Sequence, residues 1–156
     1  PTGWRPADVA AKYPVYKIED VYNFEKYDTK ASLGLHIWSW VQFILMLLFI
    51  SHLFGNIALI KQIDPNYIYL YGGFAFLTVY AYTELMDRNQ YAIFWEVAKC
   101  ALGIYFLYSQ GDWFGASATV PGIQYVIGGY FLLSILVTAW FVIKHKREDQ
   151  QQLSIA

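Results

Sequence analysis

Long apolar runs constrain this sequence more than any other feature. A helix needs about 20 mostly apolar residues to cross the hydrocarbon core of a bilayer, which is about 30 Å thick. Four runs of roughly that length are separated by short polar segments: 33–60, 67–85, 91–108 and 123–143. The pattern predicts an all-α fold, an integral membrane bundle of four transmembrane helices.

Composition favours a membrane bundle over a soluble one. Hydrophobic residues make up 57% of the chain and charged residues 15%, whereas about a quarter of the residues of a soluble domain are charged. The rival interpretation is that the runs are buried helices of a soluble bundle, which periodicity alone does not exclude. However, the fourth run carries apolar residues all the way round a helix, which indicates lipid contact: Phe131, Leu132, Leu133, Ile135, Leu136 and Val137.

The distribution of lysine and arginine predicts the orientation. Five lie before the first span, one in the turn at Arg88 and three after the last span, whereas the opposite side carries only Lys61. Nine against one is the bias expected when the first side is cytoplasmic. We therefore expect both termini in the cytoplasm. The formal net charge of -1 gives no basic excess to attract nucleic acid.

The segments outside the spans are polar. Residues 1–32 form a cytoplasmic juxtamembrane arm whose tyrosines suit the headgroup region, although a plain surface linker fits equally well. A short helix is expected after Pro6, because proline is tolerated in the first turn. Residues 144–156 form a basic and polar cytoplasmic tail that we expect to fray. The chain begins with Pro1 rather than methionine, so we expect it to continue upstream.

Two ionisable residues lie inside the third span, where charge is costly. Glu96 and Lys99 are three residues apart and therefore share a helical face. A functional interpretation makes them a polar relay or a contact to a lipid headgroup. A structural interpretation has them neutralise each other in the bundle interior, and we favour it.

The first span carries the other polar candidates. His52 and Asn56 are four residues apart and share a face, so we expect them to form an interhelical hydrogen-bond pair. His36 lies sixteen residues before His52, about 24 Å along a helix, and points in nearly the opposite direction. The two histidines therefore cannot hold one metal or haem together. Cys100 is the single cysteine, which excludes a disulfide and a multi-cysteine metal site.

Small and aromatic residues suggest packing features. The pairs Gly72-Gly73 and Gly128-Gly129 predict close helix contacts. Trp113 and Phe114 lie in a glycine-rich loop before the fourth span. They could form a lipid-facing flap, but we favour an interfacial aromatic anchor.

Two stretches resemble a known family. The first is Gly3-Trp4-Arg5-Pro6-Ala7-Asp8-Val9-Ala10, followed by Phe24 and Lys26-Tyr27-Asp28. The second runs from Glu84 through Asp87-Arg88-Asn89-Gln90 to Trp95-Glu96. Both are similar to the C-terminal membrane extension of bacterial sterol desaturase family proteins, which belong to the fatty acid hydroxylase superfamily and include alkylglycerol monooxygenase-like members.

The resemblance implies a parent protein that uses two non-haem irons and oxygen to hydroxylate, desaturate or cleave a lipid. That family binds its iron through clustered histidines, whereas this chain has only three scattered ones. No catalytic or metal residue can therefore be assigned here, and Glu84 and Glu96 match the extension in residue type only. The resemblance implies a non-catalytic membrane domain in a bacterial inner membrane, without its own cofactor, which contacts membrane lipids and an upstream catalytic domain. The rival is a stand-alone membrane scaffold or lipid-binding protein without enzymatic activity.

Overall fold

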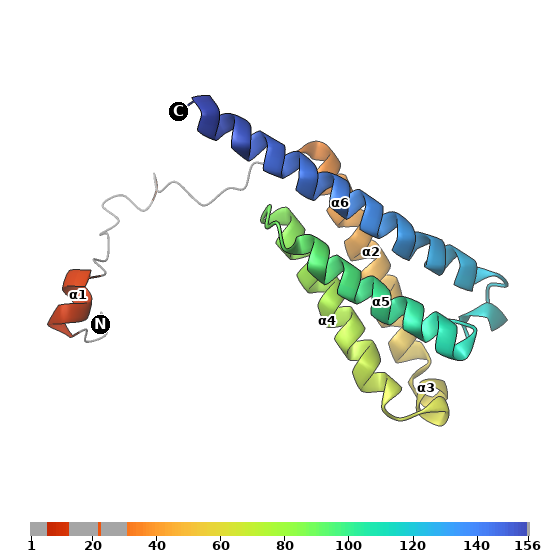
Figure 1. Ribbon diagram of the computed structural model, residues 1–156. Helices are drawn as coiled ribbons and strands as arrows, with labels where there is room; N and C mark the ends of the chain where they lie inside the picture. Colours follow the sequence, from red (N-terminus) through yellow and green to blue (C-terminus); the bar gives the residue numbers. More distant parts are fainter. Residues whose placement is uncertain (1–5, 13–21, 23–30, 156) are drawn as a thin grey trace.

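A computed structural model describes residues 6–12, 22 and 31–155 (Figure 1). These residues form helices and connecting turns, with no strand among them, so the all-α prediction is confirmed. The motif residues Gly3 to Arg5, and Phe24 to Asp28, lie outside the described residues. The helices are α1 (Ala7–Lys12), α2 (Leu33–Gly55), α3 (Ile57–Ile63), α4 (Tyr67–Met86), α5 (Ala92–Gln110), the 3-10 turn η1 (Ala116–Ala118) and α6 (Ile123–Ile155).

The long helices form a bundle in which neighbours in sequence are neighbours in space (Figure 1). Helix α4 packs between α2 and α5, and α5 packs between α4 and α6. The short helix α3 lies beside the first turn of α4. Short connections make consecutive helices antiparallel, as in an up-and-down bundle.

Three helices are long and apolar enough to cross a membrane: α2, α5 and residues 123–151 of α6. Helix α4 has 20 residues but is not among them. Its sequence contains five tyrosines, two threonines and Glu84, which lower its apolar character. The span expected at 67–85 therefore stays a prediction, and with it the total of four spans.

The first predicted span is broken at Asn56. Helix α2 ends at Gly55, and the backbone of Asn56 leaves the helical region with φ -122° and ψ 19°. The Asn56 side-chain amide donates to Nδ1 of His52 at 3.2 Å and to the His52 carbonyl at 3.1 Å. The pair expected to join two helices instead closes the last turn of α2, where the His52 carbonyl also accepts from the Asn56 backbone N–H at 3.0 Å.

The segment expected to be a frayed tail continues α6 as a helix to Ile155. Arg88, in the turn between α4 and α5, pairs with Glu148 at 3.0 Å and with Asp149 at 2.9 Å. These contacts hold the polar end of α6 beside that turn. A helix of 33 residues is about 50 Å long, which exceeds the thickness of a hydrocarbon core.

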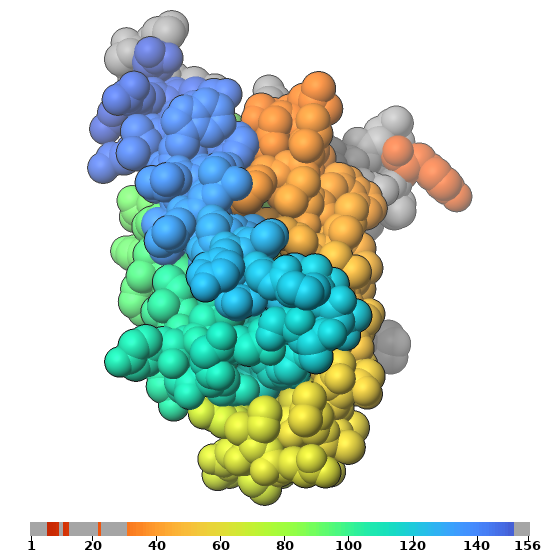
Figure 2. Space-filling view, turned by 90° about the vertical axis from the view of Figure 1, so that its right-hand side faces the viewer, coloured from red at the N-terminus to blue at the C-terminus, as the bar shows by residue number. Residues whose placement is uncertain are grey.

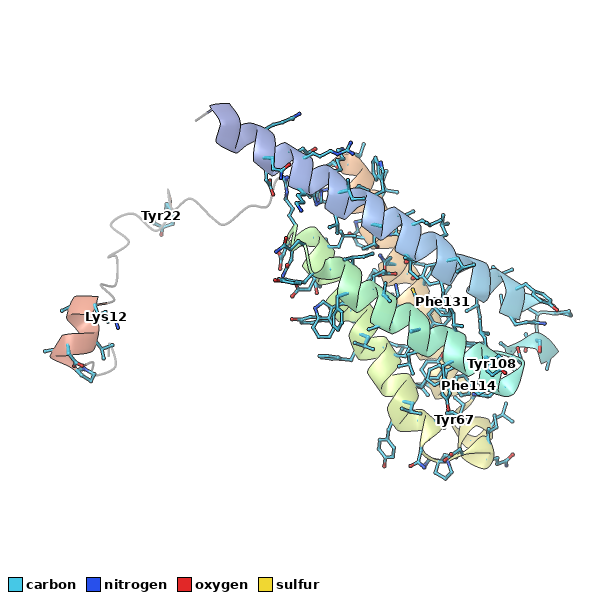
Figure 3. All side chains as sticks on the ribbon, in the orientation of Figure 1. Lys12, Tyr22, Tyr67, Tyr108, Phe114 and Phe131 are labelled. Atoms are coloured by element: carbon cyan, nitrogen blue, oxygen red, sulfur yellow. The ribbon has the colours of Figure 1, made fainter. Side chains whose placement is uncertain are left out.

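The loop between α5 and α6 folds into the bundle instead of anchoring it in an interface. Trp113 is 1% exposed and Phe114 is 0% exposed. Figure 2 shows this loop, in cyan, lying against α2, and Figure 3 shows Phe114 near Tyr67 at the same end of the bundle. Both rings belong to a buried group, here called the aromatic cluster: Phe49, Tyr71, Phe74, Phe106, Trp113, Phe114 and Phe131.

The close helix contact is made by a glycine that the sequence did not single out. A Cβ atom on Gly103 would lie 2.3 Å from the ring of Phe131, so α5 and α6 touch there. By contrast, a Cβ on Gly72, Gly73 or Gly129 would meet nothing within 4 Å. A Cβ on Gly128 would make an ordinary contact, 3.6 Å from Leu107 of α5. The predicted close contacts are therefore wrong for Gly72, Gly73 and Gly129, which face away from neighbouring helices.

We expect Gly103→Ala to destabilise the bundle. Forcing Phe131 to move costs about 1–3 kcal/mol, which outweighs the gain of about 1 kcal/mol in helix propensity. The matched control is Gly73→Ala, which adds the same methyl group to open space and should be neutral or stabilising. Thermal unfolding in detergent measures both, and an equal effect of the two variants would contradict the close contact.

Candidate functional site

A buried ion pair lies at the centre of the bundle. Glu96 and Lys99, both in α5, are 0% exposed. The ammonium nitrogen of Lys99 lies 2.5 Å from Oε1 of Glu96. The pair faces the interior between α2 and α6, and not the lipid-facing side of α5.

Helices α2 and α6 supply the remaining partners. Lys99 Nζ donates to Oε1 of Gln42 at 3.0 Å, to the Ser134 hydroxyl at 3.3 Å and to the Tyr130 hydroxyl at 3.4 Å. Oε1 of Glu96 accepts hydrogen bonds from Ser134 and, at 3.5 Å, from the Cys100 thiol. We call this group the polar cluster: Gln42, Glu96, Lys99, Cys100, Tyr130 and Ser134.

The polar cluster connects three helices through one ammonium group. Moving a single charge into a low-dielectric interior costs several kcal/mol unless an opposite charge and hydrogen bonds compensate. Lys99 has three N–H donors and finds both kinds of partner. The arrangement therefore supports neutralisation, and it fixes the faces that α2 and α6 present to α5.

Two buried polar atoms of the polar cluster have no hydrogen-bond partner among the described residues. They are Oε2 of Glu96 and Nε2 of Gln42. Chemically, the cluster can hold a charge pair and one free carboxylate oxygen away from solvent. Cys100 is buried and donates to Glu96 and to the Phe131 carbonyl, so it is not an accessible nucleophile.

The other polar candidates lie outside this cluster. Glu84 accepts a hydrogen bond from the side chain of Asn89, whose backbone N–H donates to the Glu84 carbonyl at 3.0 Å. Glu84 thus closes the turn between α4 and α5. His36 is exposed and contacts the Ser32 carbonyl through Nδ1 at 3.1 Å. His52 lines a cavity of about 210 Å³ between α2 and α6, and its Nε2 has no partner within the described part of the chain.

Sequence reasoning missed three residues of the polar cluster, Gln42, Tyr130 and Ser134. One signal was available, because Tyr130, Ser134 and Thr138 are spaced four residues apart on α6. That spacing makes a polar stripe along one face of an otherwise apolar helix. A polar stripe in an apolar helix indicates a face turned toward the bundle interior.

A separate charged group organises the end of α5. Gly111 closes the helix with φ 69°, and both carboxylate oxygens of Asp112 accept from the Ser117 N–H at 3.2 Å. Burial raises the pKa of Asp112, but the hydrogen bonds from Ser117 and from the loop backbone outweigh it, so the pKa lies below its usual value. The charged form of Asp112 therefore stabilises the folded loop.

This lowered pKa predicts how the stability contributed by Asp112 changes with pH. The contribution is present above the unfolded pKa of about 3.9 and is lost as the pH falls through the lower folded value. We expect wild type to unfold at a higher temperature than Asp112→Ala at pH 6, with the difference shrinking below about pH 4. Thermal unfolding in detergent across this range measures it, and a constant difference would contradict the assignment.

The structure is a helical bundle with a buried charge pair. Three of its helices are long and apolar enough to cross a membrane, so its class is that of a membrane protein. In comparisons with protein-family models, curated proteins and solved structures, the chain matches none of them.

Proposed function

We propose that this chain is a four-span integral membrane bundle with both termini on the cytoplasmic side. Support comes from the position of α4, which packs between α2 and α5, two helices apolar enough to span. A helix of 20 residues is about 30 Å long and matches the hydrocarbon core. Four spans also place nine of the ten lysines and arginines outside the spans on one side, and Lys61 on the other.

Cysteine labelling tests directly whether α4 spans the membrane. Single cysteines are introduced at exposed Gln62, Gln90, Thr119 and Gln150 and treated in whole cells with a membrane-impermeant maleimide. We expect labelling at positions 62 and 119 and none at 90 and 150. If α4 does not span, positions 62 and 90 will label alike. The native Cys100 is buried, so wild type is the control for background labelling.

We further propose that the bundle is the non-catalytic C-terminal membrane domain of a di-iron lipid oxidoreductase of the sterol desaturase type, in a bacterial inner membrane. The observation that carries this proposal is the Gly3-Trp4-Arg5-Pro6 motif placed before a multi-helix apolar bundle. The described residues do not fit a di-iron site, because no three His, Cys, Asp or Glu side chains among them could hold a metal. Iron would therefore belong to a catalytic domain preceding this segment, and the role of the bundle would be to hold that domain at the membrane.

The coding sequence upstream of Pro1 tests this proposal. We expect an in-frame segment with clustered histidines on predicted membrane helices. An upstream segment without such clusters would contradict the proposal and favour the rival, a stand-alone membrane scaffold or lipid-binding protein. The cavities between helices are the observation that favours lipid binding in that case.

A further inference from the structure

A hollow of about 380 Å³ lies on the outer face of α6, where this helix continues past the turn between α4 and α5 (Figure 1). Its lining residues among those described recur every three or four positions of α6, so they share one helical face: Trp140, Ile143, Lys144, Arg147, Glu148 and Gln151. The first two are apolar and the next two are basic. This site, here called the α6 hollow, therefore changes from apolar to basic along the helix axis.

The apolar part of the α6 hollow lies at the edge of the hydrocarbon core. A span that starts at Ile123 crosses the core within about 20 residues, so it ends near Ile143. Trp140 is 56% exposed and Ile143 is 53% exposed, and exposed tryptophan is typical of the boundary between acyl chains and headgroups. The ammonium nitrogen of Lys144 lies 5.4 Å from the centre of the Trp140 ring. The basic part of the hollow therefore starts at the level of the headgroups.

The two basic side chains of the α6 hollow are poorly compensated by acidic ones. Lys144 lies 3.8 Å from Oε1 of Glu148, whose other carboxylate oxygen pairs with Arg88 at 3.0 Å. Asp149 pairs with Arg88 as well. Arg147 is exposed and has no ion pair within the part of the chain that the structure describes. Like charges one turn apart on a helix repel each other, so an anion between Lys144 and Arg147 is favourable.

We propose that the α6 hollow binds an anionic glycerophospholipid, with its phosphate between the Lys144 ammonium and the Arg147 guanidinium and its acyl chains along Ile143. The proposal rests on the membrane embedding proposed above. A guanidinium binds a phosphate through two parallel N–H bonds, and a lysine adds a compact point charge. Each basic residue near an anionic lipid surface strengthens binding about fivefold. A lipid fits better than a free phosphate, because only a lipid also covers the exposed apolar part of the hollow.

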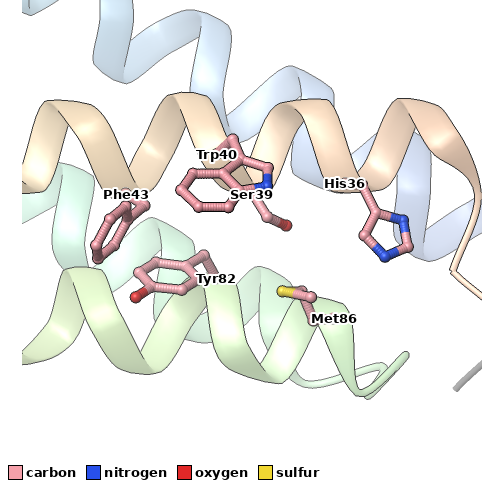
Figure 4. A pocket seen from close by; sticks show the side chains of 6 residues that line it. All are labelled: His36, Ser39, Trp40, Phe43, Tyr82 and Met86. Atoms are coloured by element: carbon pink, nitrogen blue, oxygen red, sulfur yellow. The ribbon is translucent and has the colours of Figure 1, made fainter. Parts of the chain in front are cut away.

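A groove between α2 and α4 provides an internal reference for this proposal (Figure 4). It lies at the same end of the bundle, where α2 begins and α4 ends. Its described lining includes the rings of Trp40, Phe43 and Tyr82 but no lysine or arginine. Acyl chains in this groove should therefore show no preference for the charge of their headgroup. A preference at the α6 hollow, and none at the groove, distinguishes a headgroup site from ordinary lipid contact.

Photolabelling in micelles of a non-ionic detergent tests the site. The full chain is mixed with a trace of phosphatidylglycerol that carries a diazirine in one acyl chain near the ester, and adducts are mapped by mass spectrometry. We expect adducts on Trp140 and Ile143. Unlabelled phosphatidylglycerol should compete there about 25 times better than phosphatidylcholine, the product of two fivefold contributions. For adducts on Phe43 and Tyr82, in the reference groove, the two lipids should compete equally.

Three variants separate this site from the general charge of the surface. Lys144→Gln and Arg147→Gln should each lower the preference for phosphatidylglycerol about fivefold. Lys146→Gln is the matched control, because it removes the same charge from an exposed position that lines a different hollow, beside Arg88. It should leave the preference nearly unchanged. Gel filtration checks that all three variants remain monodisperse.

Three results would overturn the proposal. An equal loss of preference in Lys146→Gln and Arg147→Gln would show diffuse attraction to anionic lipid without a site. Displacement of the probe by inorganic phosphate alone would assign the α6 hollow to a soluble anion. Both of these results would leave the adducts in the reference groove, and hence the membrane embedding, intact. A lack of acyl-chain adducts at both the hollow and the groove would instead refute the embedding on which the proposal rests.

Discussion

Replacing Trp113 by alanine is expected to lower the free energy of unfolding by about 3–5 kcal/mol, the range for deleting a large buried aromatic side chain. Trp113 is 1% exposed, and its ring lies 4.8 Å from that of Phe49 and 5.2 Å from that of Phe74. Its indole N–H also donates to the Tyr71 hydroxyl at 2.9 Å. The alanine variant therefore loses packing and a buried hydrogen bond together.

The second hydrogen bond of the Tyr71 hydroxyl lets the loss of packing be separated from the loss of the Trp113 hydrogen bond. It donates to the Phe49 carbonyl at 2.8 Å, so it keeps a partner when the indole is removed. Trp113→Phe should consequently cost less than the alanine variant. The remaining cost combines a smaller ring with one lost hydrogen bond of about 1 kcal/mol.

Unfolding in detergent by heat or by a denaturing detergent measures both Trp113 variants. The exposed Trp140, with 56% exposure, provides the control, and Trp140→Ala should cost well under half as much as Trp113→Ala. If Trp113 were an interfacial anchor, its alanine variant would fold normally in detergent and change only its behaviour in a bilayer. That result would contradict the buried position of the loop.

The sequence predicted the main helices because their signals are local. Helix α2 begins after Ser32, whose hydroxyl accepts from the Leu35 N–H at 3.3 Å, a normal start signal. Helix α4 begins after the Asp64-Pro65-Asn66 turn. The break in the first span is different, because neither Gly55 nor Asn56 adopts the left-handed conformation by which glycine and asparagine usually end a helix.

Features set by contacts between distant residues could not be predicted. The aromatic residues of the loop between α5 and α6 suit an interface and a core equally well by composition. Their burial depends on Gly115, with φ 84°, where a Cβ would lie 2.6 Å from Leu59. Likewise, the polar end of α6 is held by Arg88, some 60 residues earlier in the chain.

Only the part of the polar cluster that lies on α5 could be predicted from the sequence. The spacing of Glu96 and Lys99 predicted a shared face and a preference for neutralisation. Gln42 and Ser134 come from other helices, and their positions depend on which faces of α2 and α6 turn toward α5. That choice follows from packing such as the Gly103–Phe131 contact, which no local pattern encodes.

Removing one partner of the buried ion pair between Glu96 and Lys99 is also expected to lower the free energy of unfolding strongly. Glu96→Leu or Lys99→Met alone leaves an unpaired charge in the bundle and is expected to cost about 3–5 kcal/mol. The double variant removes both charges and should be more stable than either single variant. It should not recover fully, because Oε1 of Gln42 loses the Lys99 donor, and an unpaired buried polar group costs about 1–3 kcal/mol.

Adding Gln42→Leu to the double variant should therefore restore further stability. The expected order of stability is the single variants lowest, the double variant higher and the triple variant highest of the four. The yield of monodisperse protein and its unfolding in detergent measure this order. Lys144 and Glu148, 3.8 Å apart and about 40% exposed, form the control pair, whose coupling should be no more than about 0.5 kcal/mol.

The same series decides between the two interpretations of the polar cluster. If neutralisation is its whole role, the triple variant folds, and the parent protein proposed above retains its activity when it carries these changes. If the free Oε2 of Glu96 takes part in a relay, the triple variant folds but that activity is lost. Additive losses, with the double variant least stable, would contradict the ion pair as the reason these two residues lie inside the bundle.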